Sequence, residues 1–260
     1  MSKRAENIVA DLRLFLRQQR EGGVERWHLD ETVLAQAHEI FASRALGIAD
    51  EAAEAAAGAR AAASSTAPVT DKAELLAALD REQVSVCTKC SLHEGRTKTV
   101  FGVGNPNANV VFVGEAPGRE EDMQGEPFVG MAGQLLTKIL GAIEFRREDV
   151  YICNVLKCRP PRNRDPQPPE VAACEPYLLR QLEILQPKVI CALGRIAAQT
   201  LLQTRESLTR MRGQVHDYHG IPMMVTYHPA ALLRNPNWKR PCWEDIQKLR
   251  ALHDELTGQS

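Results

Sequence analysis

The sequence lacks several features that would assign it to a simple class. Charged or polar residues interrupt every apolar run, so no stretch is long enough to span a membrane. The amino-terminal stretch has no apolar region of the kind that a secretory signal requires, so we expect a cytoplasmic protein. The formal net charge is only −1, so no global basic field attracts nucleic acid. Any contact with nucleic acid must therefore come from local basic patches.

The cysteine count gives no support to a disulfide framework. Seven cysteines is an odd number. In a reducing compartment, cysteines more often bind metal, take part in chemistry or lie in a core than form disulfides. The chain is 44% hydrophobic and 25% charged, which is typical of a soluble globular protein with a substantial core.

Residues 1–70 differ in composition from the rest of the chain. Apolar residues at helical spacing predict amphipathic helices over 8–16 and about 31–46, so we interpret 1–50 as a helical N-terminal extension. Residues 51–70 are rich in Ala, Ser and Thr and carry almost nothing large to bury, which indicates a linker. We expect no catalytic role for this part of the chain.

From residue 71 onward, short apolar runs alternate with amphipathic helices. Four runs are typical of buried parallel strands, and helical patterns follow the first three; the runs are 110–113, 150–156, 189–193 and 223–227. This alternation predicts an α/β fold: a three-layer α/β/α arrangement around a four-stranded parallel sheet, in one domain over 71–260.

Each predicted strand ends in a glycine turn or a polar residue. The first leads into Gly114, the second ends at Asn154, the third leads into Gly194 and the fourth into His228. In parallel sheets, ligands bind beyond the carboxyl ends of the strands. The coincidence of four such ends on one edge therefore predicts a site there.

Asn154 follows an apolar strand and would be costly to bury without partners. One interpretation is a turn cap. The other is recognition of a base edge, because the amide can accept from an imide N–H and donate to a neighbouring carbonyl. Uracil presents that pair of groups, whereas cytosine presents the opposite pattern at both atoms. A dry pocket around Asn154 would thus favour uracil over cytosine.

Two ring side chains near the same edge allow a structural and a functional interpretation. Phe128 lies in a Gly-rich segment, where it could pack under the loop or form a platform for a flipped base. His228 precedes Pro229, and it is either structural or a donor to the O2 atom of a departing pyrimidine anion. Two nearby sets of basic residues are either solvated surface or phosphate contacts: Lys157, Arg159, Arg162 and Arg164, and then Arg234, Lys239 and Arg240.

The cysteines divide into two groups. Cys87 and Cys90 form a CxxC knuckle, and Cys158 and Cys174 flank a Pro-rich loop that could bring them to the knuckle. Four such ligands fit either a Cys₄ zinc site or a [4Fe–4S] cluster, and their spacing does not decide between the two. The other cysteines have apolar neighbours and are expected to be buried core residues; they are Cys153, Cys191 and Cys242.

Three long motifs occur in order: GEAPGREEDMQGEPFVGMAGQLL, KCRPPRNRDPQPPEVAAC and TYHPAALLRNP. With the CxxC knuckle, they resemble the family 4 uracil-DNA glycosylases, iron–sulfur members of the uracil glycosylase superfamily, over about residues 83–253. The resemblance implies that 71–260 is a uracil-DNA glycosylase domain with a [4Fe–4S] cluster on the two cysteine pairs. It also implies a uracil pocket, formed by Glu115, Ala116, Pro117, Phe128, Asn154 and His228.

The implied reaction is hydrolysis of the N-glycosidic bond of uracil in single- or double-stranded DNA, which starts base-excision repair. Glu115, Asn154 and His228 are the expected catalytic residues. Better-known relatives have an acid where this chain has Ala116, so Glu115 is the first candidate to activate water, and Glu121 and Asp122 are the others. Alternatively, the backbone and Asn154 hold the attacking water without a carboxylate. Gly118 stands where those relatives exclude thymine with a bulky residue, and Glu121 is the suggested substitute.

Other interpretations remain open. One superfamily variant becomes covalently trapped on uracil-DNA through a His in the Pro/Arg loop, but residues 160–165 contain no His, so ordinary turnover is expected. A second is a non-catalytic Cys₄ metal-bound module that binds DNA or a repair partner. A third, an electron carrier, rests on the cluster alone. We further expect a monomer without membrane contacts, whose N-terminal extension could meet a repair or replication partner.

Overall fold

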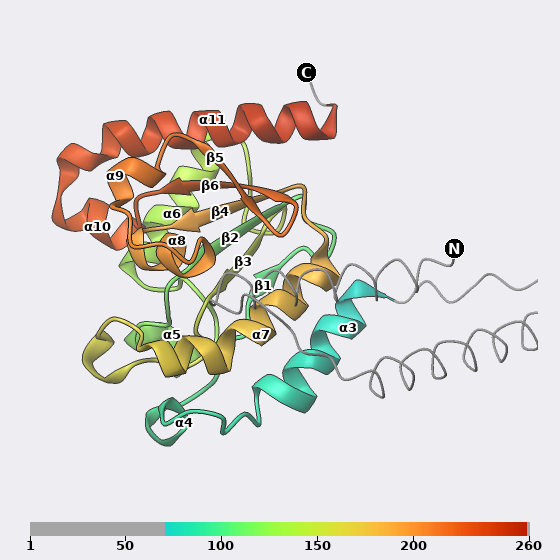
Figure 1. Ribbon diagram of the computed structural model, residues 1–260. Helices are drawn as coiled ribbons and strands as arrows, with labels where there is room; N and C mark the ends of the chain where they lie inside the picture. The colour runs from blue at the N-terminus through green and yellow to red at the C-terminus, as the bar shows by residue number, and fades with distance from the viewer. Residues whose placement is uncertain (1–70, 259–260) are drawn as a thin grey trace, which may run out of the picture. The chain divides into compact units, whose positions relative to one another are not determined.

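The structure is a computed structural model that describes residues 71–258 (Figure 1). The predicted extension over 1–50 and linker over 51–70 lie outside the described residues. The strands are β1 (Val103–Gly104), β2 (Val110–Gly114), β3 (Tyr151–Asn154), β4 (Val189–Leu193), β5 (Val215–Tyr218) and β6 (Ile221–Thr226). The helices are α3 (Lys72–Leu79), η1 (Asp80–Val84), α4 (Leu92–Gly95), α5 (Arg119–Gln124), α6 (Met131–Ala142), η2 (Pro161–Asn163), α7 (Pro168–Leu185), α8 (Arg195–Leu201), α9 (Leu208–Met211), α10 (Pro229–Arg234), η3 (Pro236–Trp238) and α11 (Lys239–Thr257).

The sheet has six strands in the order β1-β3-β2-β4-β6-β5. Its four central strands, β3, β2, β4 and β6, are parallel and correspond to the four predicted runs. The predicted four-stranded parallel sheet is nevertheless wrong in extent, because β1 and β5 add antiparallel edges to it. β1 has two residues and β5 is largely exposed, so neither forms the continuous apolar run of a buried strand.

Alternate residues of each central strand face two separate hydrophobic clusters. In β2, Val111 and Val113 face the cluster formed with α3, α7, α8 and α9. Val110 and Phe112 face the opposite cluster, formed with α6, α10 and α11. Helices therefore cover both faces of the sheet, which is the predicted three-layer arrangement (Figure 1). Cys153, Cys191 and Cys242 are buried in these clusters, so their predicted core position is confirmed.

Local sequence explains how two key elements begin. The hairpin between β5 and β6 turns at His219 and Gly220, which both have positive φ, as a two-residue I′ turn requires. α7 begins at Pro168, and the Glu170 side chain accepts a hydrogen bond from the backbone N–H of Gln167. Within the described residues, no helix is both long and apolar enough to cross a membrane.

Candidate active site

The carboxyl ends of β2 and β3 continue side by side beyond the sheet. The N–H of Val155 donates to the carbonyl of Gly114 at 2.9 Å, and the N–H of Leu156 donates to the carbonyl of Glu115 at 3.0 Å. On the other side of β2, the N–H of Gly194 donates to the carbonyl of Thr226 at 2.8 Å, which joins the ends of β4 and β6. These bonds bring all four predicted strand ends to one edge of the sheet.

Gly114 makes room for two of the predicted site residues. A Cβ atom at this position would lie 2.3 Å from Asn154 Oδ1 and 2.7 Å from Phe128 Cζ. The Asn154 amide and the Phe128 ring therefore meet over the bare backbone of Gly114. Asn154 is 2% exposed, and its Oδ1 atom has no hydrogen-bond partner among the described residues. A buried carbonyl oxygen of this kind is an open acceptor site for a ligand N–H.

Phe128 has an unusual backbone conformation, with φ of 56°. Few non-glycine residues adopt this left-handed conformation, and those that do are often found at functional sites. The Phe128 ring lies 5.4 Å from the His228 ring between centroids, with 34° between the planes. His228, at the start of α10, also contacts the β4 exit, because a Cβ on Gly194 would lie 2.8 Å from its Cβ.

The hydrogen bonding of His228 fixes its tautomer. Its Nδ1 atom accepts from the backbone N–H of Ala230 at 3.2 Å, so in the neutral ring the proton is on Nε2. Burial lowers the pKa of His228 to about 4, and the positive charge of Arg234 acts in the same direction. At neutral pH His228 is therefore a neutral donor through Nε2.

Glu115 is partly buried at the exit of β2. Burial, helped by the negative charge of Asp165 and opposed by the positive charge of Arg195, raises the pKa of Glu115 to about 7. Asp165 and Arg195 themselves form an ion pair at 3.1 Å. A carboxyl group with this pKa can accept a proton near neutral pH. Of its two neighbours in the turn, Ala116 is partly buried and Pro117 is buried.

The carboxylates of Glu121 and Asp122 already bind backbone groups. Glu121 Oε2 accepts from the N–H of Gly118 at 3.1 Å, and its Oε1 accepts from those of Val129 and Gly130 at 3.0 and 3.1 Å. Asp122 Oδ1 accepts from the N–H of Thr97 at 2.8 Å. Both side chains thus hold loops in place. Sequence reasoning did not assign this role to them, because the partner of Asp122 is 25 residues away and those of Glu121 depend on how the nearby turns fold.

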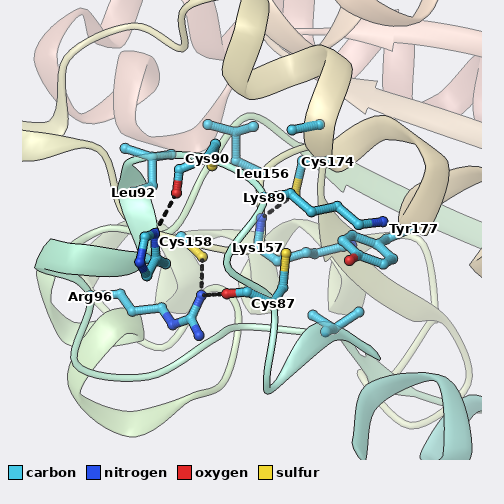
Figure 2. A pocket seen from close by; sticks show the side chains of 13 residues that line it. Cys87, Lys89, Cys90, Leu92, Arg96, Leu156, Lys157, Cys158, Cys174 and Tyr177 are labelled. Carbon is cyan, nitrogen blue, oxygen red and sulfur yellow. Dashed lines mark hydrogen bonds between the residues drawn. The ribbon is translucent and has the colours of Figure 1, made fainter. Parts of the chain in front are cut away.

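The four cysteines predicted as ligands lie around one hollow (Figure 2). Cys87 and Cys90 come from the segment between η1 and α4, Cys158 from the loop after β3, and Cys174 from α7. Figure 2 shows their sulfur atoms facing the same space. Within residues 71–258, no three Cys, His, Asp or Glu side chains are grouped closely enough to hold a single metal ion.

Donors and positive charges surround this hollow. Arg96 Nη1 donates to Cys158 Sγ at 3.4 Å and to the carbonyl of Cys87 at 2.7 Å, and the backbone N–H of Lys157 donates to Cys174 Sγ at 3.2 Å. Lys89 Nζ lies 4.6 Å from the centroid of the Tyr177 ring, which also lines the hollow. Sequence reasoning missed Arg96, because nothing in its spacing relates it to the cysteines.

The predicted basic loops are only partly available to DNA. Lys157 is 1% exposed, and its ammonium donates to the carbonyls of Asn154 and Phe101 at 2.8 and 3.1 Å, so both interpretations of this residue, solvated surface and phosphate contact, are wrong. Arg164 forms an ion pair with the buried Glu170. The basic side chains that remain exposed are Arg162, Arg234, Lys239 and Arg240.

The fold and the strand-end site place the chain in a known class. A family model described as "Uracil DNA glycosylase superfamily" matches residues 101–247, which include β2, β3, β4, β5, β6 and the strand-end site. The resemblance of the three motifs is thereby confirmed at the level of the superfamily.

Comparison with individual proteins narrows the class. A "Type-4 uracil-DNA glycosylase" of Archaeoglobus fulgidus is 49% identical over 178 residues, which cover 65% of this chain and 89% of that protein. A protein of the same name from Thermotoga maritima is 50% identical over 174 residues, covering 65% and 91%. A "Type-5 uracil-DNA glycosylase" of Pyrobaculum aerophilum is 33% identical over 146 residues, covering 50% and 64%. The chain therefore belongs to the type-4 uracil-DNA glycosylases.

Proposed function

We propose that this protein removes uracil from DNA by hydrolysing the N-glycosidic bond, and that Asn154 reads the base. The observation that carries the proposal is the Asn154 Oδ1 atom, which is buried and has no hydrogen-bond partner among residues 71–258. An unpaired buried acceptor costs about 1–3 kcal/mol. The N3–H group of uracil removes that cost, whereas the bare N3 acceptor of cytosine leaves it in place.

The residues around Asn154 can hold a flipped base and stabilise its departure. The Phe128 ring offers a stacking surface next to the Asn154 amide. The neutral His228 ring carries its proton on Nε2, which donates to O2 of uracil as negative charge develops there. A donor held in place before the reaction stabilises the leaving anion without reorganisation.

Glu115 is the residue that we assign to water activation. The competing carboxylates of Glu121 and Asp122 are committed to backbone N–H groups, whereas burial leaves Glu115 with a pKa of about 7. Ionised Glu115 takes a proton from a water molecule as the water oxygen attacks C1′ of the deoxyribose. The negative charge of Glu115 also stabilises the positive charge that develops on the sugar.

Glu121 has a different proposed role, which is to exclude thymine from the pocket. A Cβ on Gly118 would lie 2.7 Å from Glu121 Oε2, so the glutamate occupies the space that a bulky residue at Gly118 would take. We assign Glu121 as the wall against the C5 methyl group of thymine. Its backbone hydrogen bonds keep it in that place.

The four cysteines fit a [4Fe–4S] cluster better than one zinc ion. A single tetrahedral zinc needs four sulfurs at about 2.3 Å from one point. The four thiols line one hollow. Among the described residues, however, no three side chains are placed closely enough to bind one ion. The donors at Arg96 and Lys157 suit sulfur ligands that carry negative charge. When bound, the cluster supplies a structural cross-link between the knuckle, the loop after β3 and α7. No redox step is required.

The test is incubation of the full-length protein with a labelled oligonucleotide that contains one uracil, followed by alkali and a denaturing gel. We expect cleavage at the uracil in single- or double-stranded DNA, and its loss in Asn154→Ala and His228→Ala. An intact strand, from protein whose iron content is verified, would contradict the proposal.

A non-catalytic DNA-binding module is the alternative that the exposed basic residues also fit. Asn154→Asp separates the two functions, because an aspartate changes the base edge that is recognised but leaves the surface basic residues in place. A change in base choice without a change in DNA affinity excludes the module. Unchanged affinity for uracil-containing and uracil-free DNA, with no base excised by the wild type or the variant, would favour it.

A further inference from the structure

The segment 127–130 holds the proposed stacking ring in an unusual conformation, and its backbone is fastened from two sides. Phe128 has φ of 56°, a left-handed conformation that a phenylalanine adopts only when its surroundings impose it. On one side, Glu121 Oε1 accepts the N–H groups of Val129 and Gly130. These bonds involve only N–H groups of the segment, so the carbonyls of Pro127 and Phe128 need donors from another part of the chain.

Arg147 satisfies both of these carbonyls. Its Nη2 atom donates to the carbonyl of Pro127 at 2.9 Å, and its Nη1 atom donates to the carbonyl of Phe128 at 3.2 Å. Nη1 also lies 3.5 Å from Thr137 Oγ1, which anchors the guanidinium to α6. The planar fork of arginine suits two neighbouring acceptors, and the single ammonium of a lysine does not reproduce it.

The packing beneath Phe128 leaves little freedom for another arrangement. A Cβ on Gly133 of α6 would lie 1.7 Å from the Phe128 carbonyl oxygen, so the backbone of this turn rests directly on the helix. Arg147 lies in the loop between α6 and β3, outside the group of predicted site residues. It contacts the backbone of Phe128, not the ring.

We propose that Arg147 is a positioning residue for base recognition: by binding the Pro127 and Phe128 carbonyls it orients the Phe128 ring for stacking on uracil. The proposal rests on the proposed function and adds to it a residue that does not touch the base. Arg147 acts with Glu121, so that an arginine holds the acceptors and a glutamate holds the donors of the same four-residue segment.

The experiment compares three full-length single variants, and then Arg147→Met in a Phe128→Ala background, in the uracil-oligonucleotide assay with free uracil as a competitive probe of the pocket. Arg147→Met removes the donors and keeps the aliphatic stem, and Arg147→Lys keeps a charge that reaches one carbonyl at a time. Arg146→Met is the matched control, because Arg146 is the adjacent residue but is exposed and pairs with Asp149. The measured quantities are kcat, KM and the inhibition constant of free uracil.

We expect Arg147→Met to raise KM and the uracil inhibition constant about tenfold, as follows if the ring is correctly oriented in only about a tenth of the molecules, with a smaller change in kcat. Arg147→Lys should recover part of this loss, and Arg146→Met should match the wild type. In a Phe128→Ala background, Arg147→Met should no longer change the uracil inhibition constant, because no ring is left to orient. That dependence on Phe128 separates positioning from a general loss of stability.

An unchanged uracil inhibition constant in Arg147→Met, even with a lower Tm, would overturn the positioning role alone. So would an equal effect of Arg147→Met with and without the Phe128 ring. If Arg147→Met does not fold, the Lys variant alone decides, by the same comparison in the presence and absence of the ring. Failure of both the wild type and Arg146→Met to cleave would overturn the proposed function, and the positioning role with it.

Discussion

The ring of Phe128 lies 5.4 Å from the ring of His228, and the two planes are tilted by 34°. One ring comes from the segment between α5 and α6 and the other from the end of the sheet, 100 residues later in the chain. This pairing places the proposed stacking surface beside the proposed hydrogen-bond donor. Uracil bound against Phe128 would therefore have His228 beside it.

Replacement of Phe128 tests the stacking surface. Loss of base–aromatic stacking costs about 1–3 kcal/mol, so Phe128→Ala should lower kcat/KM for uracil about 5- to 150-fold. The measurement is steady-state kinetics on the uracil oligonucleotide. Phe145→Ala is the control, because the Phe145 ring contacts His253 instead. Equal kinetics of Phe128→Ala and the wild type would show that the ring only packs under its loop.

The pH dependence of the reaction tests Glu115. In the proposed role the ionised carboxylate is the active form, and it forms as the pH rises, so kcat/KM should increase with pH around a midpoint near 7. His228, with a pKa of about 4, stays neutral above pH 5 and adds no second limb there. Glu115→Gln should lower the rate by about 10²–10⁴-fold and abolish the limb.

Two charged residues near Glu115 should shift its pKa in opposite directions when they are replaced. The Asp165 charge raises the pKa of Glu115 and the Arg195 charge lowers it. Asp165→Asn should therefore shift the midpoint of the pH profile downward, and Arg195→Gln should shift it upward. A midpoint that stays in place in both variants would assign the limb to another group.

Gly114 is a position where one methyl group should disrupt the pocket. A Cβ there would lie 2.3 Å from Asn154 Oδ1, so Gly114→Ala displaces the amide or the Phe128 ring. We expect a loss of activity, with destabilisation of about 1–3 kcal/mol, as is typical of overpacking. Gly141→Ala in α6 is the control: nothing lies within 4 Å of its Cβ position, and it should stabilise the helix by up to about 1 kcal/mol. Activity assays and urea unfolding measure the two effects.

The [4Fe–4S] cluster proposed for the four cysteines can be tested by analysis of iron and sulfide. The wild type should be brown and contain iron and sulfide. Cys174→Ser should lose the colour and both elements, and its melting temperature should fall because the link between α7 and the knuckle is lost. Cys242→Ser is the control, since Cys242 is buried in the core and lies outside the hollow. Stoichiometric zinc without iron in the wild type would contradict the cluster.

The central part of the fold was predictable because parallel strands covered on both faces form continuous apolar runs. β2, β4 and β6 lie within one or two residues of their predicted ranges, whereas β3 is shorter than the run that predicted it. The edge strands were not predictable in this way, since β1 has two residues and β5 alternates exposed and buried positions. Edge strands are specified by pairing with a neighbour, and a single strand's pattern does not record that pairing.

The candidate site was likewise predictable in part. Strand-end logic selected Asn154 and His228, and the cysteine spacing selected all four cysteines around the hollow. Spacing did not distinguish zinc from a cluster, because the ligand types are the same for both. It also left three carboxylates as rivals for one role, since an aspartate or glutamate in a loop has the same chemistry in any of these positions.

The order of the residues was enough to specify the α/β class, the superfamily motifs and the side chains available at the strand ends. The folded chain was needed to show which of those side chains are free to act. Lys157 looks like a possible phosphate contact in the sequence, but its ammonium binds the backbone carbonyl of Phe101, which lies in a distant segment. Arg147, which resembles its neighbour Arg146, instead holds the turn of Phe128. The reason is physical: hydrogen-bond partners and burial arise from segments that meet only on folding, and these determine whether a charge acts on a ligand or on the protein itself.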